Sequence, residues 1–298
     1  MSVKSLSVLL LLSSLWGASF IFMRIASPVL GPFFLIECRV GIAALFLLLY
    51  ALLFKQQIHI KTKWKQYLIL GAINAAIPFV LIATAELYLT SSLAAIINAT
   101  TPLFTVIVSI LWMKEQTSMR TYLSIGMGCL GVIILVGWSP LSLSGAILGS
   151  IIASCLAAFS YGFGGVYSKL AFKEASTLEL AIGQQLGASV VLLPISLFFL
   201  PNRLPSSSVI FSVFALAIFC TAIGYLLFFY LIKNVGPTKT SSVTFLVPVF
   251  GILWGVTFLQ ESTNISMFVG LLVILASILL ESKKKGKVVV RKALQKNV

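Results

Sequence analysis

The chain has 298 residues, of which 59% are hydrophobic and 9% charged, and its formal net charge is +14. Soluble domains carry roughly 25% charged residues, and a soluble fold of this composition would expose large apolar patches. The composition therefore excludes an ordinary soluble protein and predicts one that is solvated by membrane lipid. Nucleic acid is not an expected partner, because the basic residues lie in short gaps between apolar runs and in the tail after Ser282.

The apolar runs predict membrane helices. Crossing the hydrocarbon core takes roughly 20 apolar residues as an α-helix, and these runs are continuous rather than alternating as in strands. The first run is predicted to be a retained helix rather than a signal peptide, because it stays apolar through Ala26 without a convincing cleavage site. Ten helices are predicted, at residues 5–26, 31–54, 66–87, 92–113, 121–138, 145–168, 177–200, 209–232, 238–259 and 266–281.

The basic residues predict the orientation of these helices, because cytoplasmic loops are enriched in Lys and Arg. With the N-terminus inside, every Lys and Arg except Arg24, Arg39 and Arg203 falls in a cytoplasmic segment. We therefore expect a multi-pass protein of the plasma membrane or cell inner membrane, with both termini cytoplasmic.

The chain also repeats itself. The stretch "NATTPLFTVIVSILWMKE" at residues 98–115 aligns with "TFLVPVFGILWGVTFLQE" at residues 244–261, which places Pro102 on Pro248 and Glu115 on Glu261. A shift of one residue less places Trp16 on Tyr161 and Arg39 on Gln184. Helices 1–5 therefore correspond to helices 6–10.

Each half has an odd number of helices, so the second half must be inserted upside down. The charges of equivalent gaps support this inversion. The gap after helix 2 has four Lys, as a cytoplasmic loop would, while its counterpart after helix 7 has only Arg203. The predicted fold is an all-α integral membrane protein of ten transmembrane helices in two inverted-topology five-helix repeats. Its parts are the first repeat (1–140), the second repeat (141–282) and a basic cytoplasmic tail (283–298).

Several motifs resemble the EamA family of the drug/metabolite transporter superfamily. They are "LWGASFIFMRIA", "ECRVGIA", "YGFGGVYSKL" and "LVPVFGILWGVTFLQE", together with a proline in the middle of helix 4 and a glutamate that closes it. The resemblance implies two inverted five-helix halves, export or exchange of small metabolites, and a central cavity lined mainly by helices 1, 3, 4, 6, 8 and 9. Tyr161 and Gln184 depart from the residues at the same places in the first half, which bears on substrate more than on fold.

Inverted halves can exchange conformations and so open a shared site to either side, as secondary transporters do. We expect a transporter that exports small metabolites or drug-like solutes, amino acids or amines among them, by alternating access. A passive channel, a membrane-embedded enzyme and a receptor are the alternatives. An enzyme is not expected, because the chain lacks Asp, has one histidine and has no HExxH, GxSxG or phosphate-binding loop. No cofactor or metal is expected; the expected partners are a small solute and lipid.

The cavity candidates are aromatic and small polar side chains. Rings suit an amphipathic or aromatic solute, although lipid-facing or packing rings are equally compatible with the sequence. Asn98 and Thr101 are favoured as cavity-lining residues. Packing is favoured for Thr100, Thr240, Ser241 and Ser242, and also for Thr244, although Thr244 is kept as a candidate. The complete candidate set is Trp16, Phe20, Asn74, Phe79, Asn98, Thr101, Tyr161, Tyr225 and Thr244.

Prolines and charges inside the membrane form a second set. Pro102 and Pro248 each remove a helix hydrogen bond at equivalent places, so they predict either paired hinges or static kinks. Charges in the membrane are costly. Arg24, Glu37, Arg39 and Glu86 lie at similar depth in the outer half and are interpreted as compensating pairs. The alternative is an outer gate, or a protonatable carboxylate at Glu37 or Glu86 that couples transport to protons.

Overall fold

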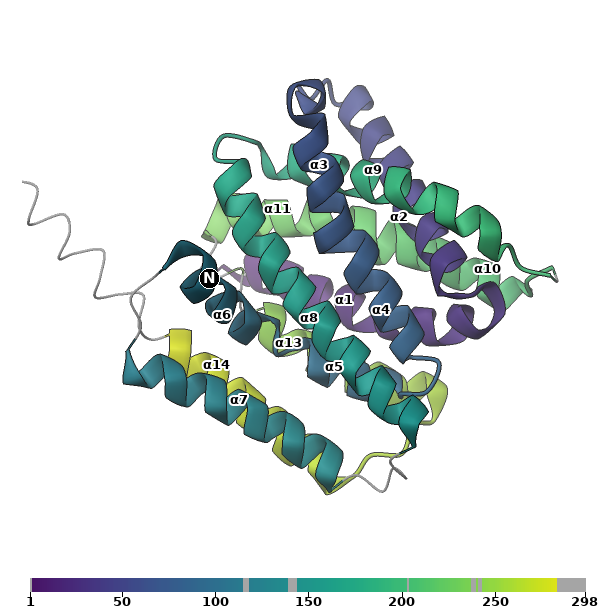
Figure 1. Ribbon diagram of the computed structural model, residues 1–298. Helices are drawn as coiled ribbons and strands as arrows, with labels where there is room; N and C mark the ends of the chain where they lie inside the picture. Colours follow the sequence, from purple (N-terminus) through teal and green to yellow (C-terminus); the bar gives the residue numbers. More distant parts are fainter. Residues whose placement is uncertain are drawn as a thin grey trace, which may run out of the picture.

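The structure is a computed structural model that describes residues 2–114, 118–138, 144–202, 204–236, 240 and 243–282. Throughout these ranges the regular elements are helices, as the sequence predicts, and they form one bundle (Figure 1). The residues outside the described part of the chain include Glu115, Arg203, Ser241, Ser242, the tail 283–298 and the boundary between residues 140 and 141.

Eight stretches of the described chain are long and apolar enough to cross a membrane. They are α1 (Val3–Leu30), α2 (Pro32–Leu53), η1–α3–η2–α4 (Ile60–Lys63, Trp64–Gly71, Ala72–Ala76 and Ile77–Ala85), α5–α6 (Ser91–Asn98 and Thr101–Met113), α7 (Met119–Gly137), α8 (Gly145–Ala171), α9–η3 (Thr177–Ser196 and Leu197–Phe199) and α10–η4–α11 (Ser207–Phe214, Ala215–Ile223 and Gly224–Val235). Two shorter apolar helices follow, α13 (Val243–Leu259) and α14 (Ile265–Ser282). A multi-pass membrane protein is thus confirmed, while the count of ten membrane helices stays a prediction.

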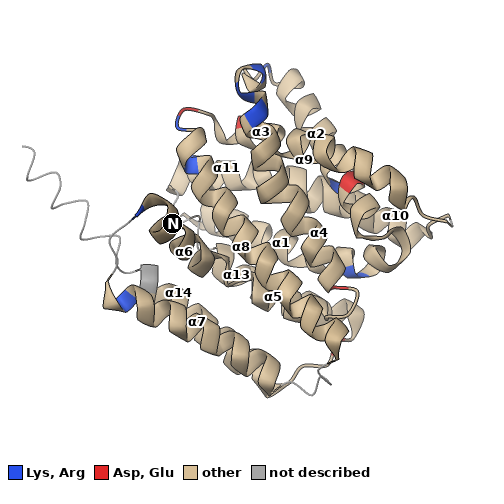
Figure 2. Cartoon of the chain, in the orientation of Figure 1, with Lys and Arg blue, Asp and Glu red and all other residues tan. Residues whose placement is uncertain are grey.

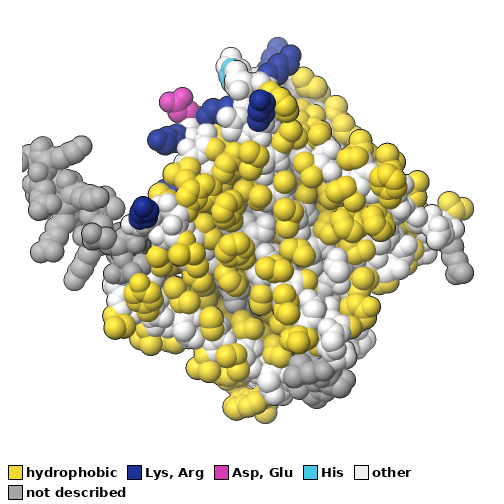
Figure 3. All heavy atoms as spheres, viewed as in Figure 1, with side chains coloured by type: hydrophobic (Ala, Val, Ile, Leu, Met, Phe, Trp, Pro, Cys, Tyr) yellow, Lys and Arg dark blue, Asp and Glu magenta, His cyan; other side chains and the backbone are white. Residues whose placement is uncertain are grey.

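The surface of the bundle is apolar. Large side chains such as Leu45, Leu111 and Ile133 are more than half exposed, and hydrophobic atoms cover most of the face seen in Figure 3. Most Lys and Arg residues lie toward one end, at the upper and left edges of Figure 2. Lys63 at this lysine-rich end donates a 2.9 Å hydrogen bond from Nζ to the carbonyl of Ala171. An apolar belt with charged residues at its edge matches the hydrocarbon core of a bilayer and its polar boundary.

Three of the membrane-spanning stretches are irregular in mid-course. The third passes through the π-helical segment η2 and the eighth through the π-helical segment η4. Pro78 has no N–H to donate to the carbonyl of Asn74, which favours the wider turn in η2. In η4 the hydroxyl of Thr221 donates to the carbonyl of Leu216, five residues earlier, at 2.8 Å. The fourth stretch is interrupted between α5 and α6, where Pro102 lies in the first turn of α6.

The helices pack in pairs that join the first half of the chain to the second. α1 packs on α13 and α8 packs on α6. α2 packs on η4, α9 packs on α3, and α7 lies beside α14 (Figure 1). The largest core cluster contains buried apolar residues of helices from both halves of the chain, half of them from α1, α2 and α4.

Candidate functional site

A cavity of about 590 Å³ lies in the middle of the bundle, within the size range of small-molecule sites. Its walls come from α1, α2, η2, α4, α5, α6, α8, η4, α11 and α13. All nine cavity candidates from the sequence line it, and so do both prolines and Arg39: Trp16, Phe20, Arg39, Asn74, Phe79, Asn98, Thr101, Pro102, Tyr161, Tyr225, Thr244 and Pro248. Their roles in binding stay predictions, but the structure brings them together.

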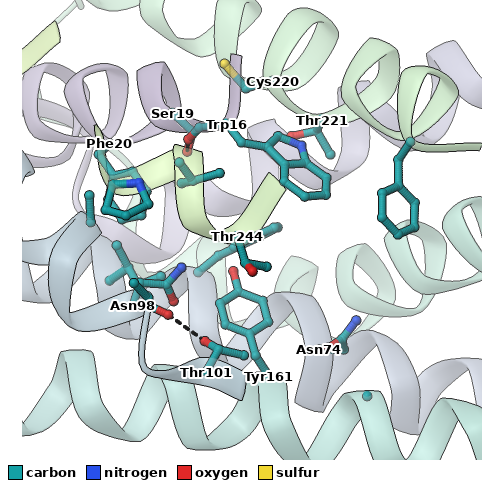
Figure 4. A pocket seen from close by; sticks show the side chains of 18 of the residues that line it. Trp16, Ser19, Phe20, Asn74, Asn98, Thr101, Tyr161, Cys220, Thr221 and Thr244 are labelled. Atoms are coloured by element: carbon teal, nitrogen blue, oxygen red, sulfur yellow. Dashed lines mark hydrogen bonds between the residues drawn. The ribbon is translucent and has the colours of Figure 1, made fainter. Parts of the chain in front are cut away.

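Aromatic rings form one wall of the cavity. Trp16 meets the edge of Tyr225 at 6.3 Å between ring centroids and lies 5.7 Å from the ring of Phe228. Phe79 and Tyr161 make a second edge-to-face pair at 6.1 Å. In Figure 4 the hydroxyl of Tyr161 points across the space toward Thr244, below Trp16. Aromatic pairs of this kind hold flat apolar groups and keep a polar tip available.

A chain of hydrogen bonds crosses between the halves beside these rings. Asn74 in η2 donates from Nδ2 to Oε1 of Gln184 in α9 at 2.6 Å. Gln184 in turn donates from Nε2 to the hydroxyl of Tyr225 at 2.6 Å. Because each group satisfies the next, the chain fixes the orientation of Asn74 and Tyr225 at the cavity wall.

The break between α5 and α6 supplies polar groups to the cavity. The hydroxyl of Thr101 donates to the carbonyl of Asn98 at 2.7 Å (Figure 4). The side-chain oxygen of Asn98 is buried and has no hydrogen-bond partner among the described residues. A buried acceptor without a donor is unfavourable unless a bound molecule or water satisfies it.

Arg39 of α2 is the one formal charge on the described cavity wall, and only 4% of its surface is exposed. Its Nε donates to the hydroxyl of Thr221 at 3.0 Å, and its Nη1 lies 3.4 Å from the sulfur of Met23. The guanidinium carbon lies 3.7 Å from the ring centroid of Phe79, in a cation–π contact. In the described part of the chain no carboxylate lies within ion-pair distance of Arg39.

The expected compensating pairs among the four membrane charges are not formed as ion pairs. Glu37 accepts a 2.5 Å hydrogen bond from the hydroxyl of Ser189 in α9. Arg24 donates to the main-chain carbonyl of Glu86, whose carboxylate oxygens are buried and have no hydrogen-bond partner among the described residues. Glu37 and Arg39 are two residues apart and point to opposite sides of α2, as their spacing predicts. One therefore faces α9 while the other faces the cavity.

The model of the EamA-like transporter family matches residues 4–137 and, a second time, residues 148–282. The chain belongs to this family. It is 28% identical over 276 residues to the uncharacterized transporter YvbV of Bacillus subtilis (strain 168), a match that covers 91% of this chain and 88% of YvbV. It is 29% identical to the uncharacterized inner membrane transporter YedA of Escherichia coli (strain K12), over 81% and 78% of the two chains.

A solved crystal structure shares the fold, with a TM-score of 0.64 over 94% of this chain and 97% of that chain. The two sequences are 16% identical, so the likeness concerns the fold alone. The resemblance to the EamA family is confirmed, and the protein is a member of a family of membrane transporters.

The cavity of this EamA-like transporter also contains residues that the sequence analysis did not select. Among them are Ser19 and Met23 of α1, Cys220 and Thr221 of η4, and Phe228 of α11. Ser19 and Met23 lie three and seven residues after Trp16, on the same helix face, and Phe228 lies three residues after Tyr225. This helical spacing could have identified them. Cys220 gives no such signal, because a lone cysteine in an apolar run is typical of packing.

Proposed function

We propose that this EamA-like transporter is a secondary carrier of the inner or plasma membrane that exports small metabolites or drug-like solutes by alternating access, with both termini cytoplasmic. The observation that carries the proposal is the symmetry of the cavity wall. Residues at equivalent places in the two halves face the same space, namely Trp16 and Tyr161, Phe79 and Tyr225, Asn98 and Thr244, and Pro102 and Pro248. A site built equally by both halves can be exposed by either one.

Three features support two inverted halves at residues 1–140 and 141–282. The family match covers the chain twice, once in each proposed half. The π-helical segments η2 and η4 overlap when the halves are superimposed with the shift that places Pro102 on Pro248. The packing of α1 on α13 corresponds to the packing of α8 on α6, as a two-fold axis in the membrane plane would require.

Contacts between the halves lie at both ends of the bundle, where gates of a carrier would close. At the end away from the lysines, the carboxylate of Glu261 accepts hydrogen bonds from the main-chain N–H and the hydroxyl of Ser91 and of Ser92, at the start of α5. At the lysine-rich end, the hydroxyl of Tyr67 donates to Glu179 at 2.8 Å. Opening the cavity outward requires the Glu261 contact to break.

Uptake and counterflow in proteoliposomes test the proposal. The purified chain is reconstituted, loaded with a mixed metabolite pool and assayed by mass spectrometry for solutes that exchange. Saturable uptake that is accelerated by solute on the opposite side is expected of a carrier. Flux that rises without saturation and without counterflow would instead indicate a channel, binding without transfer a receptor, and chemical turnover of the solute in detergent an enzyme.

Two variants test whether the transported solute passes through the cavity. Trp16→Ala removes a ring from the cavity wall and is expected to lower exchange at least tenfold, because rings dominate the wall. Trp138→Ala removes the same ring from the exposed end of α7 and is expected to leave exchange unchanged. Equal activity of the two variants would contradict the assignment of the cavity as the transport site.

A further inference from the structure

We propose that the solute is an organic monoanion with an aromatic or branched apolar body, whose carboxylate is bound by Arg39. This inference rests on the proposed function, because it names the substrate class of the same cavity. The cavity places one positive charge, Arg39, among aromatic rings.

Arg39 makes no direct ion pair with a carboxylate of the described protein. Charged side chains at membrane depth are costly, and when they are retained they face a cavity, pair with one another or act on a ligand. Arg39 faces the cavity, is 4% exposed and is the one formal charge on the described cavity wall. Glu37, two residues away on α2, is bonded to Ser189 on the other side of the helix. An anion entering the cavity would therefore meet a cation that no carboxylate of the cavity wall contacts.

Arg39 is also held in place with hydrogen-bond donors to spare. Guanidinium has five N–H groups. The described contacts use one on Nε toward Thr221 and one on Nη1 toward the sulfur of Met23, which is a weak acceptor. The ring of Phe79 packs against the guanidinium group, with 3.7 Å between the ring centroid and the guanidinium carbon. A planar group that is fixed in this way suits the two oxygens of a carboxylate.

The apolar body of the solute would contact the aromatic rings of the cavity wall. Trp16, Phe79, Tyr161, Tyr225 and Phe228 surround the space beside Arg39 with rings. No described lining residue is Asp or Glu, so the cavity offers an ammonium group no ion pair. The site therefore favours an acid over an amine of the same shape, and a zwitterion gains nothing from its positive end.

A series of three probes tests this on the purified full-length protein. Phenylacetate, phenylacetamide and phenethylamine share one ring and differ in charge, and binding is measured by quenching of tryptophan fluorescence and by calorimetry. Phenylacetate is expected to bind at least about tenfold more tightly than phenylacetamide, because a hydrogen bond to a charged group contributes more than one between neutral groups. Phenethylamine is expected to bind most weakly. Equal affinities, tighter binding of the amine, or no binding of phenylacetate would overturn the proposal.

Variants locate the preference. Arg39→Gln is expected to remove the advantage of phenylacetate over phenylacetamide, and Arg39→Lys to keep part of it. Arg120→Gln, which makes the same change at an exposed position at the start of α7, is expected to keep all of it. An advantage that survives Arg39→Gln would contradict the assignment. Should Arg39→Gln not fold, the probe series on the unaltered protein and the Arg39→Lys variant still decide the question.

Failure of this inference can be distinguished from failure of the carrier proposal. Saturable counterflow with no preference for anions would remove the role of Arg39 and leave the carrier intact. Selective binding of phenylacetate without transfer across sealed vesicles would leave the anion site intact and remove the carrier. Phenylalanine added as a fourth probe separates a requirement for a zwitterion, seen as tighter binding than phenylacetate, from the expected preference for a plain acid.

Discussion

Gly17 of α1 lies so close to Phe250 of α13 that a β-carbon at Gly17 would stand 2.7 Å from the β-carbon of Phe250. The same arrangement occurs at the equivalent place in the other half, where a β-carbon at Gly162 of α8 would stand 3.2 Å from the β-carbon of Phe104 and 2.7 Å from the main-chain nitrogen of Thr105 in α6. Small residues let membrane helices approach closely. In both contacts a glycine of one helix packs against a phenylalanine of another, α1 on α13 and α8 on α6.

Gly17→Ala and Gly162→Ala are each expected to destabilise the protein by about 1–3 kcal/mol, because the added methyl group meets main-chain atoms that cannot move away. The measurement is the thermal unfolding midpoint in detergent. Gly149→Ala, on the same helix as Gly162, is the control, because a β-carbon there meets no atom within 4 Å. A loss at Gly149 as large as at the other two sites would show that close approach is not the cause.

Glu261→Gln is expected to shift the protein toward a state in which the ends of α5 and α13 are separated. The carboxylate accepts hydrogen bonds at 2.7 and 3.1 Å from the main-chain N–H groups of Ser91 and Ser92, where a negative charge also favours the start of a helix. Losing charge-assisted bonds of about 1.5–3 kcal/mol would change the ratio of the two states about tenfold or more.

Spin labels at Tyr88 and Thr257, both exposed, report this separation by electron–electron distance measurement in a variant without native cysteines. Longer distances are expected to gain population in Glu261→Gln. Glu174→Gln, at an exposed position between α8 and α9, is the control. Identical distance distributions in all three proteins would show that Glu261 does not hold this end closed.

Tyr225→Phe is expected to lower the free energy of unfolding by about 1–3 kcal/mol, because Gln184 would be left with an unpaired N–H group in the chain from Asn74. Tyr230→Phe, at a half-buried position on the same helix, provides the control. Thermal unfolding in detergent checks both. No difference between the two variants would mean that the chain of hydrogen bonds does not hold the cavity wall.

The response of transport to an imposed pH gradient is expected to depend on Glu86 and not on Glu37. Glu86 is 0% exposed and lies beside Arg24 with both carboxylate oxygens unpartnered among the described residues, so gaining or losing a proton there changes local electrostatics strongly. Glu37 differs in that one of its carboxylate oxygens accepts a hydrogen bond from the hydroxyl of Ser189. Uptake into proteoliposomes at several pH gradients compares Glu86→Gln with Glu37→Gln. An unchanged pH response in both variants would remove proton coupling through either carboxylate.

Much of the helical framework could be predicted because a helix that crosses the bilayer needs a long continuous apolar run. Apolar length alone places a helix at 145–168, and the structure has α8 at Gly145–Ala171. Rings and amides at equivalent positions in the repeat also led to cavity-lining residues, such as Trp16 and Tyr161. The sequence repeat supplied the information here, because residues at equivalent positions of the repeat were selected together.

The interruptions and the charges could not be read in the same way. Pro102 predicted a bend within one helix, whereas the chain ends α5 at Asn98 and begins α6 at Thr101. Pro248 lies within α13. Their spacing already predicts that Glu37 and Arg39 face different sides of α2, but it does not tell which helix each one meets. That depends on which helix packs on which face, which a single sequence does not state.

Inversion of the two halves is tested most directly by the sidedness of equivalent loops. Lys61→Cys lies in η1, between α2 and α3, and Leu204→Cys lies at the equivalent place between η3 and α10, each in a variant without native cysteines. Both positions are exposed, and an impermeant maleimide is applied to intact cells and to inverted membrane vesicles. We predict labelling of Leu204→Cys only in intact cells and of Lys61→Cys only in inverted vesicles. Labelling of both from the same side would contradict inverted halves around one cavity.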